Sequence, residues 1–495
     1  MSLRTGRGAS RSALQVRTTT VLHSPVRFGG IALIPRHVRP RFSSLLFSLL
    51  ILSVSLLAQE PGPATWDKIA QDILQKTGVP SASVAIVRDG KIVYTHAYGL
   101  ANIEEKTPAQ PGMRYSIGSI SKQFTAAAIL LLQEQGKLSL DDKVSKWVPG
   151  LTDGDKVAIR QLLSHTSGYQ DYWPQDYVMP GMLKPVRAQQ ILDQWAKIPL
   201  DFTPGTKWQY SNTNYVIAGL IVEKAAGKPL WSLLQEKVFG PLGMKSITNT
   251  DEAKLPSSDP TGYMRYALGP LHPAPKEGKG WMFAAGELAM TAEDLARWDI
   301  SLINQTVLKP ESYRQMETDV LVTDGAGTGY GLGVDVGSKN GHRYLGHGGE
   351  VSGFVSQNTV FPDDHAAVVV LTNQDAIGAA GQIADKIGDT FFAPAASSST
   401  TIAKQVFLDL QQGKIDRSLF TSNCNAYFDD TSLRDHAASL GPLGRVQEFE
   451  LVRESLRGGM IHRTYRVKLD ARAVGVNSYW MPDGKLEQYI VTPRD

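Results

Sequence analysis

Between Ser119 and Gln135 the chain places apolar residues on almost every side of a helix. Ile120, Phe124 and the run Ala126–Leu132 leave little polar surface, and Gly136 is suited to cap the C-terminal end. A helix that is hydrophobic all round is stable only when other elements enclose it. The fold must therefore bury this segment in a core.

Strand patterns occur on both sides of a mainly helical central region, residues 137–310. Ser83–Val87 and Lys91–Tyr98 are predicted strands, and Asp89-Gly90 between them favours a two-residue hairpin turn. We therefore predict an α+β fold in which the two chain ends build one antiparallel sheet, with the apolar helix packed on it beside a mainly helical subdomain. The later predicted strands are Tyr330–Val336, Arg343–Gly346, Phe354–Phe361 and Ala366–Leu371.

The first 58 residues have the composition of a leader. They contain eight arginines and no lysine or acid, and they end in an apolar run, Leu45–Leu57, before Ala58. This pattern predicts a secretory signal peptide, with a mature chain in the periplasm or outside the cell and no stable membrane span after cleavage. A mitochondrial transit peptide and a start codon further downstream are the alternatives.

A linker separates the central region from a small tail. Residues 59–393 form the predicted main domain, residues 394–401 are rich in Pro, Ala, Ser and Thr, and residues 402–495 have the size of an independent α+β domain. The tail is predicted to contain helices at Ile402–Gln412 and Ser432–Leu440 and then four strands, an order that resembles SnoaL or cystatin-like domains. The strands are Val446–Ser455, Met460–Leu469, Ala473–Met481 and Leu486–Thr492.

Charge and cysteine content exclude several classes of function. The chain has 51 Lys and Arg against 48 Asp and Glu, and without the leader its net charge changes from +3 to −5. A nucleic acid or an acidic membrane is therefore not the expected partner. With Cys424 alone, neither an internal disulfide nor a cysteine-ligated metal centre can form.

The tetrapeptide Ser119-Ile120-Ser121-Lys122 opens the apolar helix. Its i, i+3 spacing places the Ser119 hydroxyl and the Lys122 amine on one face, within reach of a hydrogen bond. Burial disfavours an ammonium ion, so a buried Lys122 would have a lowered pKa and accept the Ser119 proton. In the alternative interpretation, Ser119 only caps the helix and Lys122 extends to solvent.

Two more short patterns follow, Tyr210-Ser211-Asn212 and His347-Gly348-Gly349. Ser-x-x-Lys, Tyr-x-Asn and His-x-Gly each occur once in the sequence. With these three motifs the chain resembles the serine β-lactamase and penicillin-binding-protein superfamily, in its class C-like branch with DD-peptidases and esterases. The likeness covers residues 65–392 and includes supporting stretches at residues 78–80, 159–168, 284–286 and 330–333.

The resemblance implies a two-step acyl transfer without a metal or organic cofactor. Ser119 would attack a carbonyl, while Lys122 and Tyr210 act together as the base and then protonate the leaving group. Tyr210 fits this role only if a neighbouring cation lowers its pKa from near 10. Asn212 would bind Lys122 and the substrate, and the backbone N–H groups of Ser119 and Glu350 would hold the oxyanion.

The third motif departs from the superfamily's Lys-Thr-Gly triplet. His347 replaces the lysine and Gly348 replaces the threonine, while Gly349 keeps the final glycine. Because two groups that usually bind a substrate carboxylate are altered, ester, amide or peptide substrates are favoured over β-lactams. A structural role for His347 at a strand end is the alternative.

The expected function is thus that of a serine hydrolase acting on a small molecule or peptide. The alternative is a penicillin-binding or peptidoglycan-binding sensor that is acylated or occupied without turnover. His165 is interpreted as part of a loop, and no carboxylate stands out as a deacylation base. Loop residues Asp171 to Trp173, with Trp281 and Phe283, are candidates for either a cleft lining or a cover over the core.

Overall fold

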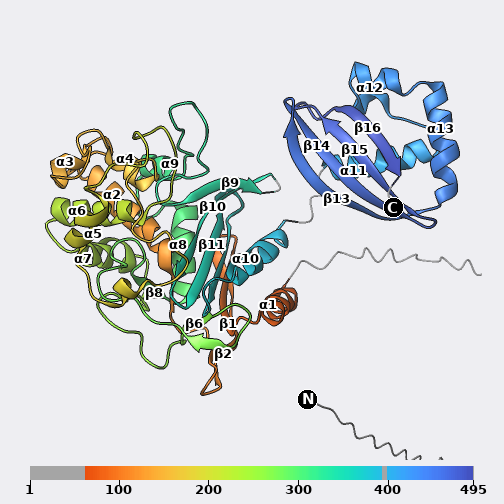
Figure 1. Cartoon of the computed structure of the whole chain (residues 1–495). Coiled ribbons are helices and arrows are strands. Elements are labelled where there is room, and N and C mark those ends of the chain that lie inside the picture. The colour runs from red at the N-terminus through yellow and green to blue at the C-terminus, as the bar shows by residue number, and fades with distance from the viewer. Residues whose placement is uncertain (1–61, 340, 393–397, 494–495) are drawn as a thin grey trace, which may run out of the picture. The chain divides into compact units, whose positions relative to one another are not determined.

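The computed structural model describes residues 62–339, 341–392 and 398–493. The predicted leader, residues 1–58, lies outside the described residues. Residues 62–392 contain a seven-stranded sheet with its helices, and residues 398–493 contain a four-stranded sheet of their own (Figure 1). Residues 62–392 are the main part and residues 398–493 are the tail.

The seven-stranded sheet joins both ends of the main part, as predicted. Its strand order is β3-β2-β1-β12-β11-β10-β9, and the strand pairs are antiparallel. At its centre Val84 of β1 pairs with Val370 of β12, and Asp89-Gly90 makes the predicted turn, both residues having positive φ. The strands are β1 Ser81–Arg88, β2 Lys91–Asn102, β3 Thr107–Pro108, β9 Asp335–Lys339, β10 His342–Val351, β11 Phe354–Phe361 and β12 Ala366–Thr372.

Both faces of this sheet are covered. Val84 and Ile86 point into one core, which is closed by α1 (Pro63–Thr77) and α10 (Ala379–Asp389). Ala85 and Val87 point into the opposite core, which contains α8 (Ala292–Asn304). The continuous burial of β1 and β12 follows from this double cover, since alternate residues serve different cores.

The apolar helix is α2, Ser121–Glu134, and it is enclosed as predicted. Twelve of its residues are buried, and it packs on α6 (Asn212–Ala226). Ser119 itself stands in the 3₁₀ turn Gly118–Ile120 just before α2. The other helices of this part are α3 Val144–Trp147, α4 Ile159–Leu163, α5 Ala188–Trp195, α7 Leu230–Leu234 and α9 Pro310–Met316, with 3₁₀ turns at Pro180–Leu183 and Pro362–Asp364 and a π turn at Gln235–Phe239.

Short strands complete the main part. They form a three-stranded sheet, β4-β8-β5, and a hairpin of β6 and β7. These strands are β4 Tyr115–Ser116, β5 Thr248–Asn249, β6 Tyr263–Arg265, β7 Leu271–Pro273 and β8 Leu288–Met290.

The predicted strand Tyr330–Val336 is wrong over its first five residues. Strand β9 begins only at Asp335, and residues 330–334 form a turn in which the Gly331 N–H donates to the Val334 carbonyl. A Cβ on Gly333, whose φ is +79°, would lie 2.9 Å from the Lys122 carbonyl oxygen. Close approach to helix α2 therefore overrides the strand pattern.

The tail contains the two predicted helices and four predicted strands in the predicted order, and a further helix, Ser422–Tyr427, that was not predicted. Its sheet β13-β14-β15-β16 packs on helices around a core that includes Phe407, Tyr465 and Trp480. The linker boundary needs correction, because the first helix already starts at Ser398, inside the predicted linker 394–401. The elements are α11 Ser398–Gln411, α12 Ser422–Tyr427, α13 Asp430–Leu440, β13 Val446–Arg457, β14 Met460–Leu469, β15 Ala473–Trp480 and β16 Leu486–Pro493, with 3₁₀ turns at Arg417–Leu419 and Gly441–Leu443.

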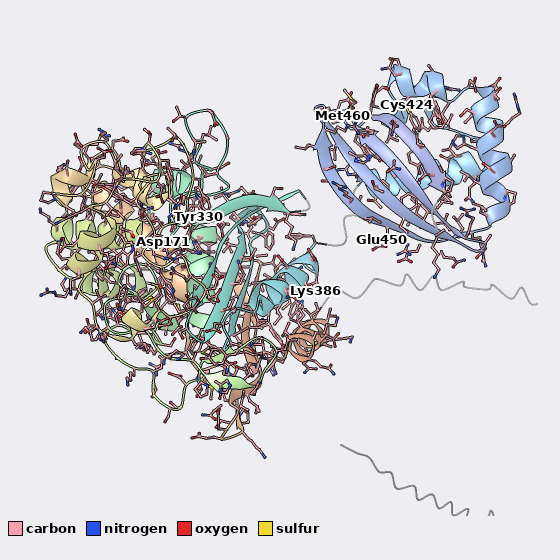
Figure 2. All side chains as sticks on the ribbon, in the orientation of Figure 1. Asp171, Tyr330, Lys386, Cys424, Glu450 and Met460 are labelled. Atoms are coloured by element: carbon pink, nitrogen blue, oxygen red, sulfur yellow. The ribbon has the colours of Figure 1, made fainter. Side chains whose placement is uncertain are left out.

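Cys424 lies on α12 within the tail (Figure 2), where it is buried and unpaired. Burial raises its pKa to about 11, so it is a thiol and not a thiolate at neutral pH. Among the described residues, no helix is both long and apolar enough to span a membrane.

Candidate active site

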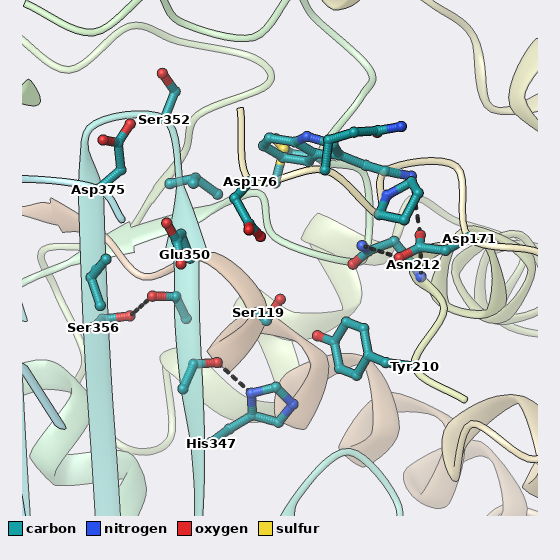
Figure 3. Close-up of a pocket in the computed structure, with 18 of the residues that line it drawn as sticks. Ser119, Asp171, Asp176, Tyr210, Asn212, His347, Glu350, Ser352, Ser356 and Asp375 are labelled. Carbon is teal, nitrogen blue, oxygen red and sulfur yellow. Dashed lines mark hydrogen bonds between the residues drawn. The ribbon is translucent and has the colours of Figure 1, made fainter. Parts of the chain in front are cut away.

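The three sequence motifs meet in one cavity of about 770 Å³ (Figure 3). Ser119 comes from the turn before α2, Tyr210 from the segment just before α6, Asn212 from the first residue of α6, and His347 from β10. Glycines 348 and 349 and Glu350 follow on the same strand and also line the cavity. Residues separated by more than two hundred positions thus share one site.

Lys122 is fully buried behind Ser119. Its Nζ lies 2.8 Å from Ser119 Oγ, 2.8 Å from Asn212 Oδ1 and 2.9 Å from the Ala285 carbonyl oxygen. The interpretation in which Lys122 extends to solvent is therefore excluded, because its relative exposure is 0%.

Desolvation lowers the Lys122 pKa to about 7, although the negative charge of Asp171 opposes this shift. The oxygens of Asn212 and Ala285 can only accept hydrogen bonds. They fix the two N–H bonds of the neutral amine, which leaves its lone pair directed at Ser119. This arrangement is the one that a base for the Ser119 hydroxyl requires, and the role itself stays a prediction.

The pKa of Tyr210 differs from the expectation. Burial raises its pKa well above 10, and the charges of Asp171 and Asp335 act in the same direction, while the Ser119 side chain opposes them. Lys122 Nζ lies 5.0 Å from the centre of the Tyr210 ring, but this neighbour does not lower the Tyr210 pKa below 10. Tyr210 is therefore a neutral phenol that can pass on a proton, and Lys122 is the group suited to remove one.

Asn212 is oriented by a carboxylate that the motifs did not single out. Its backbone N–H donates to Asp171 Oδ1 at 2.9 Å, and its Nδ2 donates to Oδ2 at 3.3 Å. With the amide nitrogen held by Asp171, the amide oxygen must face Lys122. Asp171 also lines the cavity, which is one of the two positions predicted for it from the sequence.

Two glycines allow β10 to touch the turn that carries Ser119. A Cβ on Gly349 would lie 1.9 Å from the Ile117 carbonyl oxygen, and one on Gly118, whose φ is +52°, would lie 2.7 Å from the Glu350 nitrogen. This close approach brings the Glu350 backbone N–H beside the Ser119 turn. The role of this N–H group at an oxyanion site stays a prediction.

The His347 ring is held at both nitrogens. Tyr330 Oη lies 2.8 Å from Nε2, and Nδ1 contacts the Gly348 carbonyl oxygen. Burial lowers the His347 pKa to about 3, so the ring is neutral at physiological pH. The sequence motif predicted a substrate-binding role for His347, but its single N–H already has a partner.

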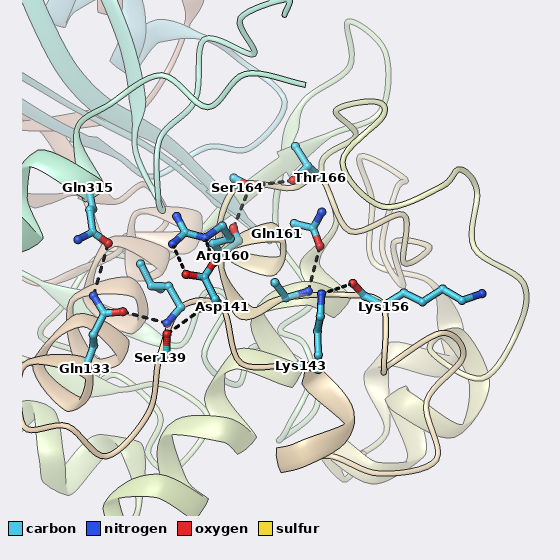
Figure 4. A network of polar contacts seen from close by, with 12 residues as sticks. Gln133, Ser139, Asp141, Lys143, Lys156, Arg160, Gln161, Ser164, Thr166 and Gln315 are labelled. Carbon is cyan, nitrogen blue, oxygen red and sulfur yellow. Dashed lines mark hydrogen bonds and ion pairs between the residues drawn. The ribbon is translucent and has the colours of Figure 1, made fainter. Parts of the chain in front are cut away.

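His165 lies in the turn after α4, in agreement with its interpretation as a loop residue, and its ring packs directly behind Tyr210. The ring centres of His165 and Tyr210 are 4.2 Å apart, and the Ser211 N–H donates to His165 Nδ1 at 3.1 Å. Its backbone is in the left-handed region, with φ +59°. The turn after α4 is held by contacts of Ser164 with the Arg160 carbonyl and Thr166 (Figure 4). His165 is therefore placed to support Tyr210.

The cavity lining is acidic and partly aromatic. Trp173, Tyr177, Val178 and Met282 supply apolar surface. Lysine and arginine do not occur among its described lining residues. Its five carboxylates are Asp171, Asp176, Asp335, Glu350 and Asp375.

Comparison with known proteins places the chain among hydrolases. It is 29% identical over 312 residues to a D-aminopeptidase of Brucella anthropi, covering 62% of this chain and 58% of the relative. A D-aminopeptidase of Cereibacter sphaeroides is 31% identical over 306 residues, covering 60% of this chain and 57% of the relative. The chain thus spans less than two thirds of the length of these relatives.

Solved structures show the same fold. A D-stereospecific amidohydrolase from Streptomyces sp. has 29% identity and a TM-score of 0.57, covering 66% of this chain and 98% of that one. An octameric penicillin-binding protein homologue from Pyrococcus abyssi, at 21% identity and a TM-score of 0.57, covers 87% of this chain and 99% of that one.

The Beta-lactamase family model matches residues 66–389. With its three motifs gathered in one cavity, the chain belongs to the beta-lactamase family.

Proposed function

We propose that this serine hydrolase of the beta-lactamase family cleaves amide or peptide bonds that follow an amino-acid residue with a free amino group, with a preference for the D configuration. The observation that carries the catalytic part is the position of Lys122 Nζ between Ser119 Oγ and two fixed acceptors. The relatives, which are D-aminopeptidases, support the substrate class.

Acylation begins when the neutral Lys122 amine accepts the Ser119 proton as Oγ attacks the substrate carbonyl. Negative charge develops on the carbonyl oxygen, and the backbone N–H groups of Ser119 and Glu350 are the donors proposed to hold it. Because Lys122 is already aligned and desolvated, little reorganisation is needed during this step.

Expulsion of the leaving group requires a proton on its nitrogen. Tyr210 is protonated and lies at the cavity beside Ser119, so we assign it the role of donor, with Lys122 resupplying its proton. Water then attacks the acyl-enzyme, and Lys122 and Tyr210 transfer protons in the reverse direction. The separate carboxylate base that the sequence did not supply is not needed in this scheme.

The residues that line the cavity favour a substrate whose acyl group is cationic and partly apolar. An α-ammonium ion would neutralise part of the charge of the carboxylates at the cavity, and the surface of Trp173, Tyr177 and Met282 fits an apolar side chain. The D preference has its support in the named relatives and in the D-stereospecific amidohydrolase.

The test compares D-phenylalanine 4-nitroanilide, its L enantiomer and the N-acetylated D compound, with wild type and Ser119→Ala. We expect turnover of the D compound, at least tenfold lower kcat/KM for the other two, and a loss of about a thousandfold or more in Ser119→Ala. Equal rates for the blocked and free amines would contradict the proposed substrate class.

The alternative of a sensor that does not turn over is tested in the same experiment. Mass spectrometry of the wild-type chain after incubation would then show a persistent acyl adduct on Ser119 without release of more than one equivalent of nitroaniline. Steady release of many equivalents would exclude the sensor.

A further inference from the structure

Asp335 lines the cavity and lies on the strand next to β10, which carries the third motif. It is the first residue of β9, and in the sheet register it pairs with Gly346, the residue before His347. Its carboxyl group is largely desolvated, which raises its pKa to about 6, so it is ionised at neutral pH. The proposed function gives this carboxylate no role beyond its share in the acidic lining.

Asp335 lies at the end of the cavity that contains Tyr210 and His347. Its register partner Gly346 directly precedes His347 on β10, and its charge raises the pKa of Tyr210. Glu350, Asp176 and Asp375 lie on one side of Ser119, and Asp171 lies on the other (Figure 3).

The Tyr210 end is where the leaving group must be located, because Tyr210 donates the proton that the departing atom receives. This step rests on the proposed function. A leaving group at this end meets His347, whose ring is neutral and held at both nitrogens. Among the described lining residues there is also no lysine or arginine to pair with an anion.

We propose that Asp335 is a specificity-determining residue that selects leaving groups without a negative charge close to the scissile bond. A leaving group with a carboxylate there would be brought into a poorly solvated space beside a like charge and without a counter-ion. Ammonia, neutral amines and amidated residues would be accepted, and an amino acid with a free α-carboxylate would be rejected.

The test uses a pair of esters that share one acyl group, 3-carbamoylphenyl acetate and 3-carboxyphenyl acetate. Each kcat/KM is divided by the rate constant of alkaline hydrolysis, which removes the difference in intrinsic reactivity. We expect the wild type to prefer the carbamoyl ester by about tenfold or more, the size expected for a like charge at a partly desolvated site. In Asp335→Asn this ratio should fall towards one.

Asp335→Glu keeps the charge and should keep the preference. Asp324→Asn removes an exposed carboxylate outside the cavity lining and should leave the ratio as in the wild type. Circular dichroism and thermal unfolding establish that the variants are folded. An unchanged ratio in folded Asp335→Asn would overturn the proposal.

A measurement on the wild type alone covers the case in which Asp335→Asn does not fold. Raising the ionic strength from 0.05 to 0.5 M screens the repulsion in part, so the corrected preference for the carbamoyl ester should decrease, by less than it would between two exposed charges. Equal corrected rates for the two wild-type reactions at low salt would overturn the role of Asp335 while leaving the hydrolase assignment intact. Absence of turnover with both esters and with the nitroanilides would overturn both proposals.

Discussion

The hydroxyl of Tyr330 lies 2.8 Å from Nε2 of His347. On the other side of the ring, Nδ1 contacts the Gly348 carbonyl oxygen, which can only accept a hydrogen bond. The proton of the neutral imidazole therefore belongs on Nδ1, and Nε2 accepts from Tyr330. Figure 2 places Tyr330, like Asp171, between the helical subdomain and the seven-stranded sheet. The contact makes His347 a positioning residue for the strand edge of the cavity.

Removing the Tyr330 hydroxyl should disturb the cavity. In Tyr330→Phe, His347 Nε2 stays buried without its donor, which costs about 1–3 kcal/mol. We expect kcat/KM on a neutral amide substrate to fall about tenfold and the pH profile of kcat/KM to change as the imidazole is released. Steady-state kinetics between pH 5 and pH 9 measure both effects.

Tyr313→Phe is the matched control, because the Tyr313 hydroxyl is also buried but bonds to the backbone of Ser301, Val307 and Leu308. It should lower stability without changing the pH profile. If the two variants behave alike in kinetics, His347 does not depend on Tyr330.

The activity should rise with pH as Lys122 loses its proton. The amine must be neutral to accept the Ser119 proton, and its pKa is about 7. The value of kcat/KM should therefore increase about tenfold per pH unit below pH 7 and level off above it. A profile that rises only near pH 10 would show that Lys122 remains an ordinary ammonium ion.

Lys122→Arg should be inactive over the same range, because a guanidinium is not deprotonated in proteins. Lys224→Arg is the control, since Lys224 is exposed on α6 and its Nζ donates to the Trp147 carbonyl oxygen, away from the cavity. It should retain the wild-type rate and profile.

His165 is expected to act through the backbone of Ser211 and the ring of Tyr210. His165→Leu leaves the Ser211 N–H buried without an acceptor, so we expect a loss of about 1–3 kcal/mol in the free energy of unfolding. His165→Asn puts an oxygen at the place of Nδ1 and tolerates positive φ, so it should recover most of that loss. Urea unfolding compares the three proteins.

The ring contact is tested by kcat in the same variants. Neither asparagine nor leucine replaces the aromatic surface behind Tyr210, so kcat should fall in both. Full stability together with full kcat in His165→Leu would show that the original interpretation of His165 as plain loop structure was sufficient.

Asp299 should make stability fall as pH rises. This carboxyl group is fully buried on α8 and accepts from Asn358 Nδ2 at 2.7 Å, and desolvation raises its pKa to about 8. The folded chain therefore holds a proton that the unfolded chain has released between pH 4 and pH 8. The contribution of Asp299 to the free energy of unfolding is largest below pH 4 and decreases by about 1.4 kcal/mol per pH unit across that window.

The matched comparison is Asp299→Asn, which keeps the acceptor for Asn358 and cannot titrate. The difference in the free energy of unfolding between variant and wild type should move in favour of the variant from pH 5 to pH 7. A difference that is independent of pH would show that Asp299 has the same pKa in both states.

The sequence predicted those parts of the site that short motifs carry. Ser119 and Lys122 lie on one helical turn, so their proximity follows from spacing alone. The neutral Tyr210, by contrast, depends on burial by elements far away in the chain. Asp335 and the turn at Tyr330 owe their positions to contacts with β10 and α2, which no local pattern encodes.

The same distinction holds for the fold. The hairpin at Asp89-Gly90 and the helix after Thr291 were predictable because turn and cap chemistry act within a few residues; Thr291 accepts from the Asp294 N–H at 3.2 Å. Helix α10 was not predicted, and its role in covering the outer face of the sheet appears only with the tertiary structure.

The pairing of β1 with β12 also has a consequence for how the chain folds. Ser81 donates its backbone N–H to Asn373 Oδ1 across 292 residues of sequence. Closing so long a loop costs entropy before the contact returns any stability, so sheets of this kind form slowly. Strand β1 must remain without its central partner until β12, the last strand of this sheet along the chain, is available. The nucleophile and the strand that completes its cavity can therefore come together only late in folding, which keeps partly folded chains catalytically silent.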